Sequence, residues 1–186
     1  MGMTNHCSVR GRYVSIYQDA FDEVIEAYID AGFFQRGQLK LTTIDEIAIH
    51  AWKNEWGGKT RKHRHGGWDW QRMASKRAKR CKKFDLAIWG DNVLCGLSLG
   101  LVTRGKKTVR LDYLEACPTS HPLESLITPI VVAVAIAVGQ RVGAEYVAIF
   151  NPVNEAVEKH YGNLGFVKRR MYNRFLKNVM YKEIPK

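Results

Sequence analysis

The chain has 186 residues, of which 46% are hydrophobic and 25% are charged, and it carries a formal charge of +11. This size and balance predict one soluble globular domain, residues 1–186, and exclude a disordered or fibrous chain. The longest apolar run, residues 126–138, contains Thr128 and Pro129 and is too short to cross a membrane, so we expect no membrane association.

The four cysteines predict a reducing compartment. They are Cys7, Cys81, Cys95 and Cys117, with no CxxC pair and no spacing typical of metal ligands. Cys95 and Cys117 lie in apolar runs that resemble strands, so we expect buried thiols there. The N-terminus carries no apolar signal segment. Together these features predict a cytoplasmic protein.

The first half of the chain predicts helices. Apolar residues recur at helical spacing over residues 18–34. A capping-box signature at residues 43–46 opens a second helix, which we expect to end at Gly57-Gly58. Residues 69–82 predict a third helix.

The second half predicts strands separated by helices. The turn Gly90-Asp91-Asn92 is typical of a β-hairpin, and Gly143-Ala144 closes an apolar helix. The expected strands cover residues 84–89, 93–103, 108–117, 146–150, 166–174 and 178–184, and the expected helices cover residues 129–142 and 154–163.

The segment from Asn154 to Phe166 has the most specific pattern in the chain. Asn154 is a favoured N-cap residue, Val157 and Tyr161 share one helical face, and Gly165 suits a left-handed helix end. Ala156 stands two positions after Asn154, and Leu-Gly-Phe follows Tyr161 after two further residues. A packed helix whose Tyr161 serves only the core also agrees with this pattern.

This order and spacing resemble the closing motif of the GCN5-related N-acetyltransferase (GNAT) superfamily. The resemblance implies an α/β (α+β) fold with a mixed, mostly antiparallel central sheet, a splayed parallel strand pair and helices on both faces. Residues 12–17 only hint at the first strand of that family, and residues 55–83 form a basic insertion.

The resemblance also implies acetyl-CoA as the cofactor, bound between the strands at 109–117 and 146–150. The backbone of Leu114 and Ala116 would hold the acetyl and pantetheine groups. Tyr161 would protonate the departing thiolate, and Asn154 would position the cofactor or a water. The candidates for a general base are Asp112 and Glu115, which we expect to face opposite sides because strand side chains alternate.

The pyrophosphate of the cofactor would lie at the N-terminus of the helix after this strand. The glycines of the family's motif are absent, and the aligned segment runs from Leu123 to Thr128. We expect Thr128 to cap the helix, Pro129 to take its first position, and the segment from Ser125 through Leu126 and Ile127 to Thr128 to offer the remaining contacts. An ordinary capped helix that binds nothing agrees equally well.

Eleven cations between Lys59 and Lys83 are opposed only by Asp69. A solvated face explains such a run, and so does a surface for the phosphates of RNA with tryptophans that stack on bases. The candidates for nucleic-acid contacts are Arg61, Arg64, Trp68, Trp70, Arg72, Lys76, Arg77, Lys79 and Arg80. We expect no metal at His50, His63 and His65, because no carboxylate or cysteine has suitable spacing.

Two functions therefore stand at this stage. The first is an acetyl-CoA-dependent N-acyltransferase that acts on an amine of a protein, a small molecule or an aminoacyl-tRNA. The alternative is a catalytically inactive GNAT-like protein that binds nucleic acid through the basic surface at 59–83. Exchange of the terminal strands is one route to a homodimer.

Overall fold

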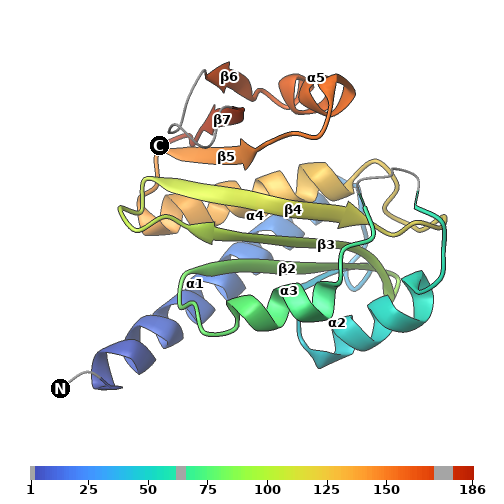
Figure 1. Cartoon of the computed structure of the whole chain (residues 1–186), viewed down its shortest axis with the longest axis horizontal. Coiled ribbons are helices and arrows are strands. Elements are labelled where there is room, and N and C mark those ends of the chain that lie inside the picture. Colours follow the sequence, from blue (N-terminus) through green and yellow to red (C-terminus); the bar gives the residue numbers. More distant parts are fainter. Residues whose placement is uncertain (1–2, 62–65, 170–177) are drawn as a thin grey trace.

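The computed structural model describes residues 3–61, 66–169 and 178–186. Over these ranges the strands form one mixed sheet in the order β1-β2-β3-β4-β5-β7-β6 (Figure 1). The strands are β1 (Leu39–Thr42), β2 (Lys83–Gly90), β3 (Val93–Val102), β4 (Thr108–Ala116), β5 (Tyr146–Phe150), β6 (Val167–Arg169) and β7 (Val179–Glu183). The helices are α1 (Met3–Asp30), α2 (Glu46–Ala51), α3 (Trp70–Arg77), α4 (Ile127–Val142) and α5 (Glu155–Asn163), and a π-helical turn, η1 (Trp52–Trp56), extends α2.

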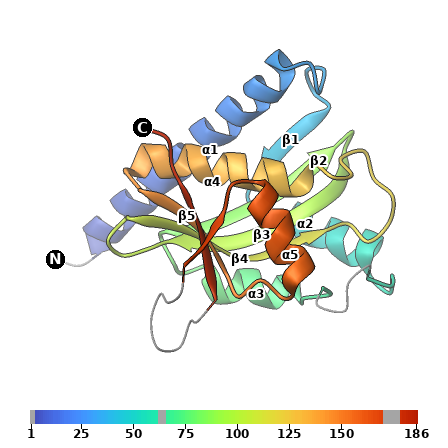
Figure 2. The ribbon, with the colours of Figure 1, turned by 90° about the horizontal axis from the view of Figure 1, so that it is seen from above.

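Helices cover both faces of the sheet. Helices α1 and α4 pack against one face, where Phe21 and Ile130 belong to a single apolar cluster with the strands (Figures 1 and 2). The segments α2, η1 and α3 pack against the other face, where Trp56 and Trp70 are fully buried. The fold class predicted from the sequence is therefore confirmed. In the described ranges, no helix combines the length and apolar character needed to cross a bilayer.

The N-terminal part of the structure differs from the prediction. Residues 12–17 are not a strand but lie within α1, which begins at Met3. Tyr13, Tyr17, Phe21 and Val24 are all buried at helical spacing, so packing against α4 extends the helix over residues whose local pattern resembles a strand. The strand at the sheet edge is instead β1, only four residues long, which the sequence analysis missed.

Most later elements lie where they were predicted, with shifted helix ends. Asp91 and Asn92 both have positive φ in the β2–β3 turn, as a two-residue hairpin requires. Asp45, not Thr43, caps α2, since its Oδ1 accepts from Ala48 N at 2.8 Å. Helix α3 ends at Arg77 rather than Lys82.

Strands β4 and β5 pair in parallel only over their first residues. The register runs from Thr108 opposite Tyr146 to Leu111 opposite Ile149, and then the pairing stops. Strand β4 continues to Ala116 along β3, so its far half has no strand on the β5 side within the described residues. The predicted splayed pair is confirmed.

A β-bulge lies where the two strands part. Leu99 pairs with Tyr113 and Gly100 pairs with Leu111, which leaves Asp112 as the extra residue of β4. Gly100 allows this close approach, because a Cβ there would lie 1.9 Å from the carbonyl oxygen of Arg110. The bulge therefore depends on the absence of a side chain at Gly100.

Gly100→Ala should lower the free energy of unfolding by about 3 kcal/mol, because the added methyl group meets backbone that cannot move aside. Urea denaturation measures the change. Gly162→Ala is the matched control, since it adds the same methyl group within α5 where no atom lies within 4 Å. That variant should gain about 0.5–1 kcal/mol from helix propensity. Equal stability of the two variants would contradict the role given to Gly100.

Candidate active site

The far half of β4 directs unpaired backbone groups toward the gap beside it. Cys117 N donates to Cys95 O at 2.8 Å, so Cys117 directs its backbone groups toward β3. Hydrogen-bonded and non-hydrogen-bonded pairs alternate along an antiparallel ladder. Glu115 therefore also faces β3, while Leu114 and Ala116 direct their N–H and C=O groups to the open edge. Leu114 and Ala116 are the two residues whose backbone groups the resemblance to the GNAT superfamily implied as contacts of the cofactor.

The carboxylate of Asp112 is held by two arginines. Arg77 Nη2, from α3, lies 2.7 Å from Asp112 Oδ2, and Arg110 Nε lies 2.5 Å from Oδ1. The guanidinium of Arg110 also lies 4.9 Å from the ring centroid of Phe150, at the end of β5. Asp112 thus ties the bulge to α3 at the point where β4 and β5 separate.

The carboxylate of Glu115 anchors the loop that leads into α3. Its side chain is buried, with Oε1 accepting from Gly67 N at 2.7 Å and Oε2 accepting from Trp70 Nε1 at 2.6 Å. Arg61 Nε lies 2.8 Å from Oε1, and Arg61 Nη1 donates to Trp56 O at 2.7 Å. These contacts fix the segment before α3 against the end of β4.

The prediction that Asp112 and Glu115 face opposite sides is wrong. Both contact groups of α3 or the loop before it, and so both lie on the same face of the sheet. The bulge is the physical reason, because one extra residue reverses the alternation between them. Since their oxygens are committed to other partners, we assign neither Asp112 nor Glu115 as the general base.

The N-terminus of α4 is pressed onto the sheet beside the open edge. A Cβ at Gly96 would lie 2.7 Å from Ile127 Cγ2, and one at Gly90 would lie 2.7 Å from Leu123 Cγ. Gly96 pairs with Ala116, so α4 begins directly beside the far end of β4. The two glycines therefore permit close packing of this helix start against the sheet.

The start of α4 differs from the prediction in its capping. The helix begins at Ile127, so Thr128 and Pro129 lie inside its first turn rather than at the cap and first position. The cap residue is Leu126, which makes no side-chain capping bond, and Ser125 before it has φ of 67°. Within the described residues no side chain caps this helix, so the N–H groups of Ile127 and Thr128 suit an anion.

Helix α5, which contains Tyr161, lies beyond the end of β5 (Figures 1 and 2). Asn154 caps this helix, with Oδ1 accepting from Val157 N at 2.9 Å, as predicted. Glu158 fixes the helix to the C-terminal strands by accepting from Asn178 Nδ2 at 2.6 Å and Lys168 Nζ at 3.0 Å. The position of α5 is thus set by its N-cap and by the contacts of Glu158 near its middle.

The phenol of Tyr161 is 8% exposed and packs edge-on against Phe166, with 5.6 Å between ring centroids. Its hydroxyl makes no hydrogen bond to any described residue, unlike the hydroxyl of Tyr17, which donates to Lys83 O. Burial raises the pKa of Tyr161 to about 12. The group therefore stays protonated at neutral pH, and its O–H donates to no other group among the described residues.

Comparison with solved structures identifies this architecture. A putative acetyltransferase of the GNAT family from Desulfovibrio desulfuricans superposes with a TM-score of 0.57 at 12% identity, covering 79% of this chain and 99% of that one. This chain has the GNAT fold. The ribosomal-protein-S18-alanine N-acetyltransferase from Escherichia coli gives 0.56 at 13% identity, covering 80% and 95%.

A third GNAT-fold neighbour was solved with its ligand. It is a putative acetyltransferase from Salmonella typhimurium with its cofactor acetyl-CoA, which gives a TM-score of 0.53 at 13% identity and covers 81% of this chain and 96% of that one. No protein-family model and no curated protein matches the sequence. At these identities the likeness shows the fold alone.

The candidates for nucleic-acid contacts at residues 59–83 are partly buried and partly exposed. Trp70 is 0% exposed and Trp68 packs against it and Tyr113, so Trp70 is not a platform for bases, contrary to the prediction. Arg61 and Arg77 are committed to Glu115 and Asp112. The candidates that remain exposed are Arg72, Lys76, Lys79 and Arg80, while Arg64, His63 and His65 lie outside the described residues.

The cysteines that the structure describes fully are thiols, as predicted. Cys95 and Cys117 are buried and Cys81 is half-buried. Burial raises the pKa of the Cys95 thiol to about 11. A thiol with such a pKa is a weak nucleophile at neutral pH, so Cys95 serves packing. The side chain of Cys7 lies outside the described residues.

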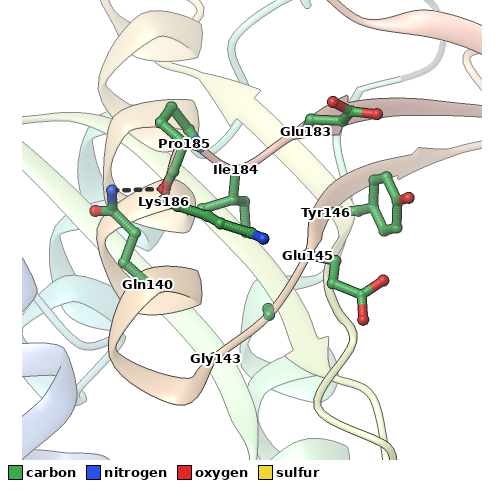
Figure 3. Close-up of a pocket in the computed structure, with 9 residues that line it drawn as sticks. Gln140, Gly143, Glu145, Tyr146, Glu183, Ile184, Pro185 and Lys186 are labelled. Atoms are coloured by element: carbon green, nitrogen blue, oxygen red, sulfur yellow. Dashed lines mark hydrogen bonds between the residues drawn. The ribbon is translucent and has the colours of Figure 1, made fainter.

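A separate cavity of about 610 Å³ lies at the opposite end of β5 (Figure 3). It is bounded by the end of α4 and the C-terminal segment, where Gln140 Nε2 donates to Pro185 O at 3.0 Å. Its walls belong to the part of the sheet where β4 and β5 are paired, so it offers no free backbone groups of the kind found at Leu114 and Ala116. We place the candidate active site at the splay instead.

Glu115→Gln should lower the free energy of unfolding by about 3 kcal/mol, because Arg61 then keeps a half-buried charge without a partner. Chemical denaturation measures this change. Glu55→Gln, at an exposed position, is the control and should change stability by less than about 0.5 kcal/mol. Adding Arg61→Gln to the first variant should restore part of the loss; no recovery in the double variant would contradict the proposed pairing.

Proposed function

We propose that this protein is an acyl-CoA-dependent N-acyltransferase, with acetyl-CoA as the default donor. One observation carries the proposal: strands β4 and β5 part after Leu111, and the unpaired backbones of Leu114 and Ala116 face the gap. The solved neighbour with acetyl-CoA supports the same cofactor at the level of the fold.

The residues around the gap suit the parts of coenzyme A. Amide groups of the pantetheine arm match the N–H and C=O groups of Leu114 and Ala116, which lack a strand partner. The uncapped start of α4 suits a pyrophosphate, because free N–H groups and the helix dipole both favour an anion. The positive φ of Ser125 shapes the turn before this helix start in place of the absent glycines.

The chemistry follows from the groups at the thioester end. Bound acetyl-CoA supplies an activated acyl group. The N–H of Ala116 is proposed to polarise the acyl carbonyl, and the hydroxyl of Tyr161 to donate its proton to the departing sulfur. With Asp112 and Glu115 held in ion pairs, the amine is proposed to lose its proton to water.

The acceptor is proposed only as an amine, which a protein, a small molecule or an aminoacyl-tRNA can carry. The two carboxylates of β4, which are the acidic groups nearest the gap along that strand, are already paired with arginines, so recognition of a cationic amine is not assigned to them. A catalytically inactive protein of the same fold is the competing function, and cofactor binding separates the two.

Calorimetric titration with acetyl-CoA should give saturable binding. Ala116→Pro removes one N–H that faces the gap and none that bonds β3, so the fold should persist while affinity falls about tenfold or more. Ala116→Ser keeps the N–H and is the matched control, with affinity expected to match the original chain. Absence of heat and of a thermal shift at millimolar acetyl-CoA would favour the inactive protein.

Tyr161→Phe should lower kcat by about 10²-fold and leave the affinity for acetyl-CoA unchanged, because only the proton donor is lost. Release of the CoA thiol, with the best acceptor from a panel of amines, measures the rate. Because burial raises the pKa of Tyr161 to about 12, the phenol should keep its proton from pH 7 to 10. The kcat of the original chain should therefore not fall over this range through loss of that proton, and the variant should show a pH profile of the same shape. An unchanged kcat would remove Tyr161 from the mechanism.

A further inference from the structure

The cations of residues 59–83 fall into two groups once their partners are known. Arg61, Arg77 and Lys83 pair with Glu115, Asp112 and Asp85. The second group has no ion pair within the described residues. Five of its members lie along α3 and the turn after it, namely Arg72, Lys76, Lys79, Arg80 and Lys82, and Lys59 lies before the helix. Lys62 and Arg64 lie outside the described residues.

A second segment extends this unpaired group. Lys82 Nζ donates to Arg104 O at 3.4 Å, so the turn after α3 lies against the β3–β4 turn. That turn adds Arg104 and Lys106, which also lack an ion pair in the part of the chain that the structure describes. We call these seven residues the basic stripe: Arg72, Lys76, Lys79, Arg80, Lys82, Arg104 and Lys106.

The basic stripe is not balanced by acidic groups. Asp69, the single acid of residues 59–83, is occupied as the N-cap of α3, with Oδ1 accepting from Arg72 N at 2.9 Å. Arg72 and Lys76 are four apart on α3, and such a like-charged pair destabilises a helix by about 0.2–0.5 kcal/mol. A face that only has to stay soluble normally mixes charges of both signs. The stripe retains repulsion that a bound polyanion would relieve.

We propose that the basic stripe binds the sugar–phosphate backbone of a nucleic acid. Helix α3, Trp70–Arg77, advances about 12 Å at the rise of a helix, a length that spans several phosphates of one nucleic-acid strand. Arginine forks and flexible lysines that follow one another along α3 and the turns beside it suit a line of phosphates better than a single small anion. Binding through backbone phosphates carries no sequence preference.

The basic stripe and the gap between β4 and β5 lie on elements that contact each other. Helix α3 begins at Trp70, whose Nε1 donates to Glu115 on the far half of β4, and from there the helix extends back along the sheet to Asp112. Helix α3 is therefore attached to the strand that borders the gap between β4 and β5. The basic stripe shares no residue with the proposed acyl-transfer site, so the two proposals can be tested separately.

Fluorescence anisotropy with a labelled 20-nucleotide single-stranded RNA, titrated with the full chain at several salt concentrations, tests the proposal. A plot of log affinity against log salt should have a slope of about −3 to −5, as expected for release of counterions from several phosphates. A slope near zero, or no binding at low salt, would overturn it.

The decisive comparison uses two charge-reversal variants of equal net charge. Lys76→Glu with Lys79→Glu and Arg80→Glu changes the stripe, whereas Arg12→Glu with Lys40→Glu and Lys186→Glu changes exposed cations elsewhere. The stripe variant should lose at least tenfold in affinity and flatten the salt slope by about 2, while the control stays within twofold to threefold. Equal losses would reduce the binding to net charge and contradict the proposal.

An acidic polypeptide is the competing partner. Polyglutamate of matched charge should displace the RNA at least tenfold less effectively than unlabelled RNA. Displacement with equal potency would identify a general polyanion surface instead and overturn the assignment to nucleic acid. Every substituted side chain is exposed, so both variants should keep the melting temperature of the original chain. Unchanged melting temperatures would exclude unfolding as the cause of a loss of affinity.

Discussion

The separation of β4 from β5 is the constraint on which the rest of the site depends. A sheet normally pairs every backbone group, and unpaired groups in a buried setting are costly. Here the parallel ladder ends at Leu111, and the bulge at Asp112 turns the remainder of β4 away from its neighbour. Gly100 makes the bulge sterically possible, and Arg110 and Arg77 hold its carboxylate in place.

The same ion pairs that shape β4 also attach the opposite layer. Glu115 and Asp112 each contact the segment around α3, so the helix that carries the basic stripe and the strand that borders the gap are joined by charge pairs and by Trp70. Such pairs are weak evidence for net stability, but breaking one leaves an unpaired charge. They fix the geometry of the two surfaces relative to each other.

Local sequence signals were sufficient wherever neighbouring residues decide the structure. Asn154 caps α5, Gly165 has positive φ at its end, and Asp91-Asn92 forms the hairpin turn, because these preferences belong to the residues themselves. The longer strands also lie where alternating and apolar runs predicted them. The short strand β1 was missed because four residues carry too little pattern, and residues 12–17 were misassigned because packing against α4 overrode a local resemblance to a strand.

The sequence by itself determined the order of the elements, the hairpin, the motif helix with Tyr161 and the excess of positive charge. Only the tertiary structure decided which charges are free. Arg61 and Trp70 meet Glu115, and Arg77 meets Asp112, across separations of 35 to 54 residues. No local spacing encodes such partners, since they depend on a bulge that brings both carboxylates of β4 to one face. For that reason Asp112 and Glu115, predicted as general bases, are structural contacts of α3 and the loop before it, and only part of the basic segment is without an ion pair among the described residues.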